Sequence, residues 1–235
     1  MASCASIAPE RTRADKMTTL ISDTFLVSDS LTGEELRARQ ECGGDRYDEV
    51  WDGVYLMSPL ANIEHQLLAT RLAAVIQIAI GLGDAGTAIA GVNVSDRETD
   101  WTKNYRCPDV AVILKGCAAK NCDTHWWGGP DFLVEIVSPD DHSRKKLDFY
   151  AGIKVRELLI VDRLPWALEL YRLDAGELRS VGRSTVDSPS QLQSAVLPLN
   201  FRLVPGDVRP GEIRKSEVRP VIEITHNDGR QAGRI

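Results

Sequence analysis

The stretch "GPDFLVEIVSPDDHSRKKLDFYAG", residues 129–152, decides how this chain folds. Its residues from Phe132 to Val137 form a short apolar run, which is typical of a strand in the middle of a sheet. Glu135 interrupts that run. An ionised carboxylate in an apolar strand is costly unless it is paired or holds a metal ion. We therefore expect a buried strand whose acidic residue has a specific partner.

A Ser-Pro break and a helix follow this strand. The segment 143–152 is predicted to be helical and to end at its glycine. The helix begins either at Ser138, in an S-x-x-D cap, or at Ser143. Lys146 lies four residues before Tyr150, so both side chains belong to one face of the helix. Of the three consecutive basic residues, we expect Lys146 to face back toward Glu135.

The chain before this stretch contains helix and strand signals. Residues 47–59 alternate in hydrophobicity around Asp52-Gly53, a dipeptide typical of a tight hairpin. A long helix is predicted from Asn62, a good N-cap, to Ile80. Its inward-facing residues are expected to be His65, Leu68, Leu72, Val75 and Ala79. Further elements are a helix at 31–42 with Thr32 as its cap, and strands at 91–95 and 108–114.

Strand signals dominate the chain after the helix. Residues 156–162 read as a buried strand and 166–173 as a partly exposed one, with shorter candidates at 177–182, 193–197 and 200–204. These elements predict an α/β fold with a mixed central β-sheet flanked by helices, and with additional strands toward the C-terminus. One domain is expected over residues 21–205. Residues 1–20 are expected to form a flexible tail, with either Met1 or Met17 as the true start, and residues 206–235 a charged, loosely ordered tail.

The composition is that of an ordinary soluble globular protein, with 43% hydrophobic and 26% charged residues. The formal charge of −6 argues against a protein that coats nucleic acid electrostatically, although it permits a local basic patch beside an acidic centre. No apolar run approaches the roughly 18 residues that span a membrane, and the N-terminus has no apolar signal region. We expect a cytoplasmic protein that does not bind membranes.

Five cysteines form no regular disulfide framework. A zinc site is one alternative interpretation of some of them, but the spacing lacks the usual CxxC knuckle. The candidate ligands are Cys107, Cys117, Cys122 and His125.

Two carboxylates stand on neighbouring strand candidates. Asp109 follows Pro108 at the head of one strand, and Glu135 lies inside the next. Adjacent strands are about 4.8 Å apart, so side chains on the same face could converge on one ion. Two carboxylates with a backbone carbonyl and waters suit Mg²⁺ or Mn²⁺ rather than zinc. Such an ion activates water and neutralises phosphate, and a nearby lysine would complete this chemistry.

The ordered motifs "YDEVWDG", "EHQ", "YRCPDVAV", "GGPDFLVEIVSP", "KKLDFYAG" and "RELLIVD" resemble the PD-(D/E)XK nuclease superfamily. Within it they are most similar to the Uma2 family of restriction-endonuclease-like proteins, filed as a domain of unknown function. The resemblance covers roughly residues 28–175. It implies a restriction-endonuclease-like core, a homodimer, and an endonuclease that hydrolyses DNA phosphodiester bonds with Mg²⁺ or Mn²⁺.

The resemblance also assigns site residues. Asp109 and Glu135 would be metal ligands, with help from the carbonyl of Ile136. Glu49, in the E-x-x-D-G segment, would be a third acid. His65, at the histidine position that opens the long helix, would line the site.

One position departs from the superfamily pattern. The catalytic lysine is expected two residues after the strand glutamate, and here that position is Val137. The Uma2 pattern instead has a lysine four residues before the helix tyrosine, which is Lys146. The resemblance thus implies a lysine displaced onto the following helix, with a longer reach to the same site.

Each acidic candidate also has a purely structural interpretation. Asp109 could cap a turn, and Glu49 could be an exposed hairpin residue. Glu135 could form a buried ion pair with Arg106 or Arg156.

The other candidates have structural interpretations too. Lys146 could be a solvated helix residue, and His65 a hydrogen-bonded core histidine. Trp126 and Trp127 could be packing residues, or a platform on which nucleic-acid bases stack.

The sequence is also compatible with two other functions. The chain could be a nuclease-fold protein that binds nucleic acid or a protein partner without cutting. Its substrate could also be RNA or a single strand, and no helix-turn-helix or zinc-finger reader predicts sequence specificity.

Overall fold

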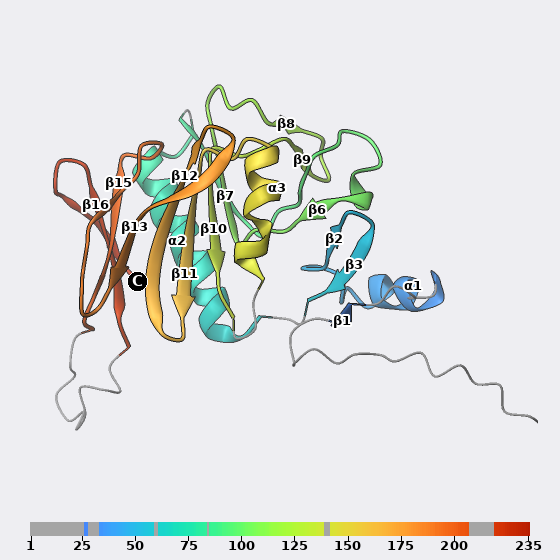
Figure 1. The fold of residues 1–235 in the computed structure, drawn as a ribbon, viewed down its shortest axis with the longest axis horizontal. Coiled ribbons are helices and arrows are strands. Elements are labelled where there is room, and N and C mark those ends of the chain that lie inside the picture. Colours follow the sequence, from blue (N-terminus) through green and yellow to red (C-terminus); the bar gives the residue numbers. More distant parts are fainter. Residues whose placement is uncertain (1–25, 28–32, 59–60, 84, 139–141, 207–218) are drawn as a thin grey trace, which may run out of the picture.

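The computed structural model describes residues 26–27, 33–58, 61–83, 85–138, 142–206 and 219–235. Three β-sheets and a few helices form the fold (Figure 1). The helical elements are α1 (Gly33–Glu41), α2 (Ile63–Ile80), the 3₁₀ turns η2 (Trp101–Lys103) and η3 (Ser143–Lys146), and α3 (Leu147–Gly152). The predicted class is confirmed, while the predicted tail at 1–20 and the proposed cap Thr32 lie outside the described residues.

A six-stranded mixed sheet forms the centre. Its strands, in spatial order, are β13 (Glu177–Thr185), β12 (Trp166–Asp174), β11 (Glu157–Arg163), β10 (Phe132–Ile136), β7 (Val110–Leu114) and β4 (Gly86–Ala90). β10 runs parallel to β11 and antiparallel to β7. Every residue of β10 is buried, which explains why its sequence is nearly continuous in apolar residues.

Helices cover the two faces of this sheet. Alternate residues such as Val110, Phe132 and Val134 pack in the core that contains α2. The residues between them, such as Leu133, pack in a second core with Tyr150 of α3. Side chains of a strand alternate between faces, so Glu135 follows Leu133 and points to the α3 side. The fold therefore places the acid of β10 under α3.

The seven-stranded sheet carries the predicted hairpin. Its order is β1 (Leu26–Val27), β3 (Val54–Met57), β2 (Glu49–Trp51), β6 (Tyr105–Arg106), β5 (Val94–Ser95), β9 (Trp126–Trp127) and β8 (Lys120–Asn121). Asp52 and Gly53 both have positive φ, 48° and 87°, between β2 and β3. This is the backbone of a type I′ turn, and the hairpin prediction is confirmed.

Helix α2 begins where the sequence predicts. The side chain of Asn62 accepts a hydrogen bond from the backbone N–H of His65 at 3.0 Å, and Gly81 at φ 92° follows the last helical residue. The buried stripe is shifted from the prediction: its residues are His65, Leu68, Ala69, Leu72, Ile76 and Ile80. Val75 and Ala79 are only partly buried, because the helix keeps to a spacing of four residues along its second half.

Among the described helices, only α2 is long and apolar enough to cross a membrane by length and composition. It packs instead as a core helix, with Leu68, Leu72 and Ile76 fully buried.

The C-terminal prediction was partly wrong. β14 (Leu192–Gln193), β15 (Leu199–Val204), β16 (Val221–His226) and β17 (Gln231–Arg234) form a four-stranded antiparallel sheet. Residues 219–235 are therefore not a loose tail, because Ile222 and Ile224 are fully buried in the α2 core. Residues 207–218 lie outside the described residues.

The predicted strand at 91–95 was also partly wrong. The edge strand β4 ends at Ala90, and β5 begins at Val94. Gly91 at φ 61° separates them, so one chain segment passes from the central sheet to the seven-stranded sheet.

Candidate active site

Glu135 is the buried acid of β10, with 3% of its surface exposed. Its carboxylate accepts a hydrogen bond of 2.5 Å from the Tyr150 hydroxyl. The Lys146 ammonium donates to the same carboxylate at 3.1 and 3.2 Å. Both donors belong to the helical segment that follows the strand, η3 and α3. The apolar strand thus tolerates an acid because that acid is paired and hydrogen-bonded in place.

Lys146 joins two acids from two different sheets. Its ammonium also lies 2.8 Å from Oε1 of Glu49 in β2. The prediction that Lys146 faces back toward Glu135 is confirmed, and the interpretation as a solvated helix residue is wrong, since it is 7% exposed. A long side chain on a helix has therefore reached the site, although Val137 occupies the usual lysine position.

Glu49 is held as firmly as Glu135. It is 2% exposed, so the interpretation as an exposed hairpin residue is wrong. Besides Lys146, the backbone N–H of Cys107 donates to Oε1 at 2.9 Å, and the indole N–H of Trp51 donates to Oε2 at 2.7 Å. Hairpin strand β2 therefore presents a carboxylate with a fixed orientation to the central sheet.

Asp109 and His65 form the second half of the cluster. Oδ2 of Asp109 accepts the backbone N–H of Ile136 at 2.7 Å and lies 3.3 Å from Nε2 of His65. The same Nε2 lies 3.0 Å from the carbonyl oxygen of Ile136. Because both neighbours of Nε2 are acceptors, that nitrogen carries the proton in the neutral ring. Nδ1 of His65 is buried and has no hydrogen-bond partner among the described residues.

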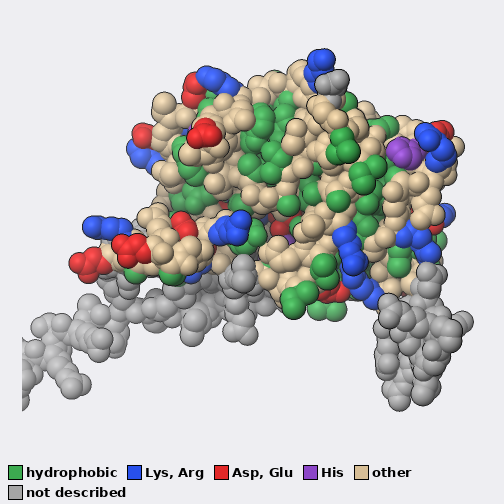
Figure 2. All heavy atoms as spheres, turned by 180° about the vertical axis from the view of Figure 1, so that it is seen from behind, with side chains coloured by type: hydrophobic (Ala, Val, Ile, Leu, Met, Phe, Trp, Pro, Cys, Tyr) green, Lys and Arg blue, Asp and Glu red, His purple; other side chains and the backbone are tan. Residues whose placement is uncertain are grey.

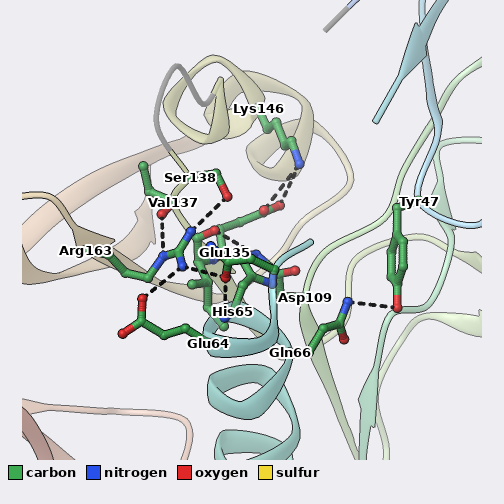
Figure 3. Close-up of polar contacts among 12 residues, drawn as sticks. Tyr47, Glu64, His65, Gln66, Asp109, Glu135, Val137, Ser138, Lys146 and Arg163 are labelled. Carbon is green, nitrogen blue, oxygen red and sulfur yellow. Dashed lines mark hydrogen bonds and ion pairs between the residues drawn. The ribbon is translucent and has the colours of Figure 1, made fainter. Parts of the chain in front are cut away.

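Arg163 fixes the end of β10 against the start of α2. Its guanidinium donates to the carbonyl of Val137 and to the hydroxyl of Ser138, both at 3.1 Å. It also contacts Asn62 at 3.1 Å and Glu64 at 3.2 Å, at the first turn of α2 (Figure 3). These contacts of Arg163 hold His65 and the Ile136 carbonyl in fixed positions.

Asp109 and Glu135 lie next to the last pair of the β7–β10 ladder. The register pairs Val112 with Phe132 and ends with Val110 and Val134. Asp109 precedes Val110, and its Oδ2 accepts the N–H of Ile136, the residue after Glu135. Figure 3 shows Asp109 and His65 below Glu135, with Lys146 on its other side.

The donor set fits a hard divalent cation. Two carboxylates and a backbone carbonyl are all-oxygen ligands, and Mg²⁺ binds through one or two carboxylates while it keeps several waters. Within the described ranges, no three or more His, Cys, Asp or Glu side chains are grouped so that they could hold a metal. Any ion here would therefore rest on the two carboxylates, the Ile136 carbonyl, water and a ligand.

Because no such group of side chains exists among the described residues, the zinc site considered for the cysteines is ruled out there. His125 has both ring nitrogens engaged, with Nε2 2.9 Å from the carbonyl of Arg97 and Nδ1 3.2 Å from the Thr124 hydroxyl. Cys107 is buried beside Glu49, and burial raises the pKa of its thiol well above the usual range.

One face of the molecule is hollowed. Figure 2 shows acidic side chains at the bottom of a recess, between the lobe that holds α1 with β1–β3 and the rest of the molecule. Asp109 is the most accessible member of the cluster, since its side chain is 16% exposed. A ligand would therefore meet Asp109 first.

Two further groups set the electrostatics around the acids. Burial, and secondly the charge of Glu135, raise the pKa of the Tyr150 hydroxyl well above 10, so it stays a donor. Arg106 is sandwiched between the rings of Trp51, at 4.5 Å, and Phe149, at 4.1 Å. This sandwich holds the Trp51 indole against Glu49 and connects β2 to α3.

Comparison with known proteins identifies the family of the chain. A family model described as Uma2, "Putative restriction endonuclease", matches residues 34–205. The chain belongs to the Uma2 family. A crystal structure from Anabaena variabilis, described as a "putative nuclease belonging to DUF820", superposes with a TM-score of 0.50 at 15% identity. The match covers 65% of this chain and 84% of the Anabaena chain, and it shows that the two chains share a fold. No curated protein matches the chain.

The Uma2 assignment agrees with the motifs found in the sequence. The structure brings Glu49, Glu135 and Lys146 into direct contact, and Asp109 with His65 into a second contact group that shares β10.

Two contributors to the site were not predicted. The hydrogen bond from Tyr150 to Glu135 was not predicted. Tyr150 lies four residues after Lys146 on the same helix face, and this spacing could have predicted the contact. Trp51 lies two residues after Glu49, so the period of a strand sets both side chains on one face.

Proposed function

We propose that this Uma2 protein is a metal-dependent endonuclease that hydrolyses phosphodiester bonds of DNA. The observation that supports this most is the contact of the Glu135 carboxylate with the Lys146 ammonium, next to Ile136, whose N–H binds Asp109. Two acids near the ends of neighbouring strands and a lysine from the following helical segment are groups that phosphoryl transfer uses. They combine positioned negative charge for a cation with a positive group for the phosphate.

Asp109 and Glu135 would hold Mg²⁺ or Mn²⁺, with the carbonyl of Ile136 as a third ligand. When bound, such an ion neutralises phosphate charge and makes a bound water a better nucleophile. His65 holds both Asp109 and the Ile136 carbonyl through Nε2, which keeps these oxygen donors at a fixed separation.

Lys146 is the group that would contact the substrate phosphate. Its three ammonium protons already reach Glu49 and Glu135, which restrict its motion. A scissile phosphate beside Glu135 would accept one of these donors. Glu49 then acts by positioning Lys146, and Tyr150 by orienting the carboxylate of Glu135.

Nicking of supercoiled plasmid in the presence of Mg²⁺ or Mn²⁺ tests this function. We expect wild type to nick and Glu135→Ala to lose nicking by at least about 100-fold, because a metal ligand and the partner of Lys146 disappear together. If wild type and Glu135→Ala nick equally, the activity comes from elsewhere and the assignment fails.

One observation favours a second candidate, a nuclease-fold protein that binds nucleic acid or a protein partner without cutting. Lys146 already pairs with both Glu135 and Glu49, so these acids have a counter-charge without a divalent ion. This candidate predicts no heat of Mn²⁺ binding in calorimetry and no loss of thermal stability in EDTA. The nuclease predicts measurable Mn²⁺ binding that Glu135→Gln weakens.

A further inference from the structure

A cavity of about 460 Å³ is lined in part by α3. It opens between α3 and the segment around β9, and its volume is within the range of about 300–1,000 Å³ of small-ligand sites. Its lining residues are Asp96, Trp127, Gly128, Phe149, Gly152 and Ile153.

Aromatic rings form two of its walls, and each ring has a polar or cationic neighbour. The Trp127 indole N–H donates to the carbonyl of Asp96 at 3.2 Å, and the Lys120 ammonium lies 5.6 Å from the ring. The Phe149 ring contacts the Arg106 guanidinium at 4.1 Å. Trp127 is nevertheless 37% exposed. The rings are therefore fixed in place and still open to a ligand.

The cavity has one charged lining residue, an acceptor. The carboxylate of Asp96 receives one donor on each oxygen, from Asn104 at 3.0 Å and from Arg97 at 3.2 Å. Each carboxylate oxygen accepts two hydrogen bonds, so Asp96 can take another donor. A flat ring with an amino group satisfies both the aromatic walls and this acceptor.

We propose that this cavity binds an unpaired nucleobase that carries an exocyclic amino group. Bases stack on aromatic side chains, and enzymes that act on nucleic acids read a displaced base by stacking and hydrogen bonds to its edge. Helix α3 connects the cavity to the acidic cluster, because Phe149 lines the cavity while its neighbour Tyr150 contacts Glu135. The ligand is thus a nucleotide near the cleaved bond, and that connection rests on the proposed function.

Fluorescence anisotropy of labelled 12-mers tests the site without metal, in EDTA and low salt. Wild type is expected to bind single-stranded dC12 more tightly than dT12, since only cytosine has the amino group, and more tightly than a 12-bp duplex. Trp127→Ala is expected to weaken dC12 binding about 5- to 100-fold, and Trp127→Phe to retain most of it.

A second variant fills the cavity without removing a contact. A Cβ added at Gly152 meets no atom within 4 Å, so Gly152→Leu adds volume that the fold accepts. It is expected to weaken dC12 binding as Trp127→Ala does, while Ser180→Leu on exposed β13 leaves binding unchanged. Equal melting temperatures of all variants would confirm that they fold.

Equal dC12 affinity of wild type, Trp127→Ala and Gly152→Leu would overturn the base site. Binding of dT12 as tight as that of dC12 would overturn the role of Asp96. These results are separate from the proposed function: a protein that binds dC12 through Trp127 but never nicks plasmid keeps the base site and loses the nuclease. A protein that nicks plasmid while wild type, Trp127→Ala and Gly152→Leu bind dC12 equally keeps the nuclease and loses the base site.

Discussion

Replacing Lys146 with methionine would remove the charge that Glu49 and Glu135 share. Methionine keeps the length of the side chain but leaves two carboxylates, 2% and 3% exposed, without the ammonium between them. Removal of one partner from a buried ion pair costs about 3–5 kcal/mol, because the remaining charge stays buried. We expect Lys146→Met to lower the free energy of unfolding by about this amount, which for a chain of this size lowers Tm by about 6–20 °C.

Urea unfolding at pH 7, followed by tryptophan fluorescence, measures the loss. Lys103→Met is the matched control, since Lys103 pairs with Asp100 at 2.9 Å while both side chains are more than 60% exposed. That control is expected to lose less than about 1 kcal/mol. Adding Glu135→Gln to Lys146→Met is expected to recover about 1–3 kcal/mol, because it removes one of the two unpaired charges.

A loss below about 1 kcal/mol for Lys146→Met would refute this reasoning. It would mean that the acids find another counter-charge or water, and that Lys146 does not hold the two sheets together. An unchanged loss after addition of Glu135→Gln would refute the pairing of Lys146 with Glu135 in particular.

We propose that the exposed apolar residues of α2, such as Leu67, form the surface of the homodimer that the family resemblance implies. Light scattering should then find a dimer for wild type and a monomer for Leu67→Glu, and a dimer in both would place the interface elsewhere. Because the pKa of Tyr150 is raised in the folded state, stability should fall as pH rises above about 10, by up to about 1.4 kcal/mol per pH unit from this group. Tyr150→Phe should make that slope shallower in urea titrations, and an unchanged slope would contradict the shift. At pH 8, iodoacetamide should label exposed Cys42 but not buried Cys107 until urea is added, as read by peptide mass spectrometry; early labelling of Cys107 would contradict its burial.

Local signals in the sequence predicted most of the elements around the site. Asn62 and Gly81 delimit α2, and Asp52-Gly53 forms the turn of the hairpin, because caps and positive-φ turns depend on a few adjacent residues. Glu135 could be predicted as a site residue because a charged side chain in an apolar strand is costly without a partner.

Long-range pairing could not be predicted in the same way. Glu49 and Lys146 are 97 residues apart and belong to different layers, so no local pattern connects them. The strands β16 and β17 were missed because charge and length suggested a tail, although Val221–His226 does alternate between buried and partly buried residues. Their order depends on the apolar surface that α2 and β15 supply, which the segment's own sequence does not contain.

We propose that Asp109 and Glu135 form one cation site served by Lys146. Anomalous diffraction from crystals grown with Mn²⁺ tests this site. We predict a peak bonded to both carboxylates and to the carbonyl of Ile136, at about 2.0–2.2 Å, and its loss in Glu135→Gln. A map without a peak at this place, with the Lys146 ammonium still on Glu135 and Glu49 in wild-type crystals that contain Mn²⁺, would contradict the claim.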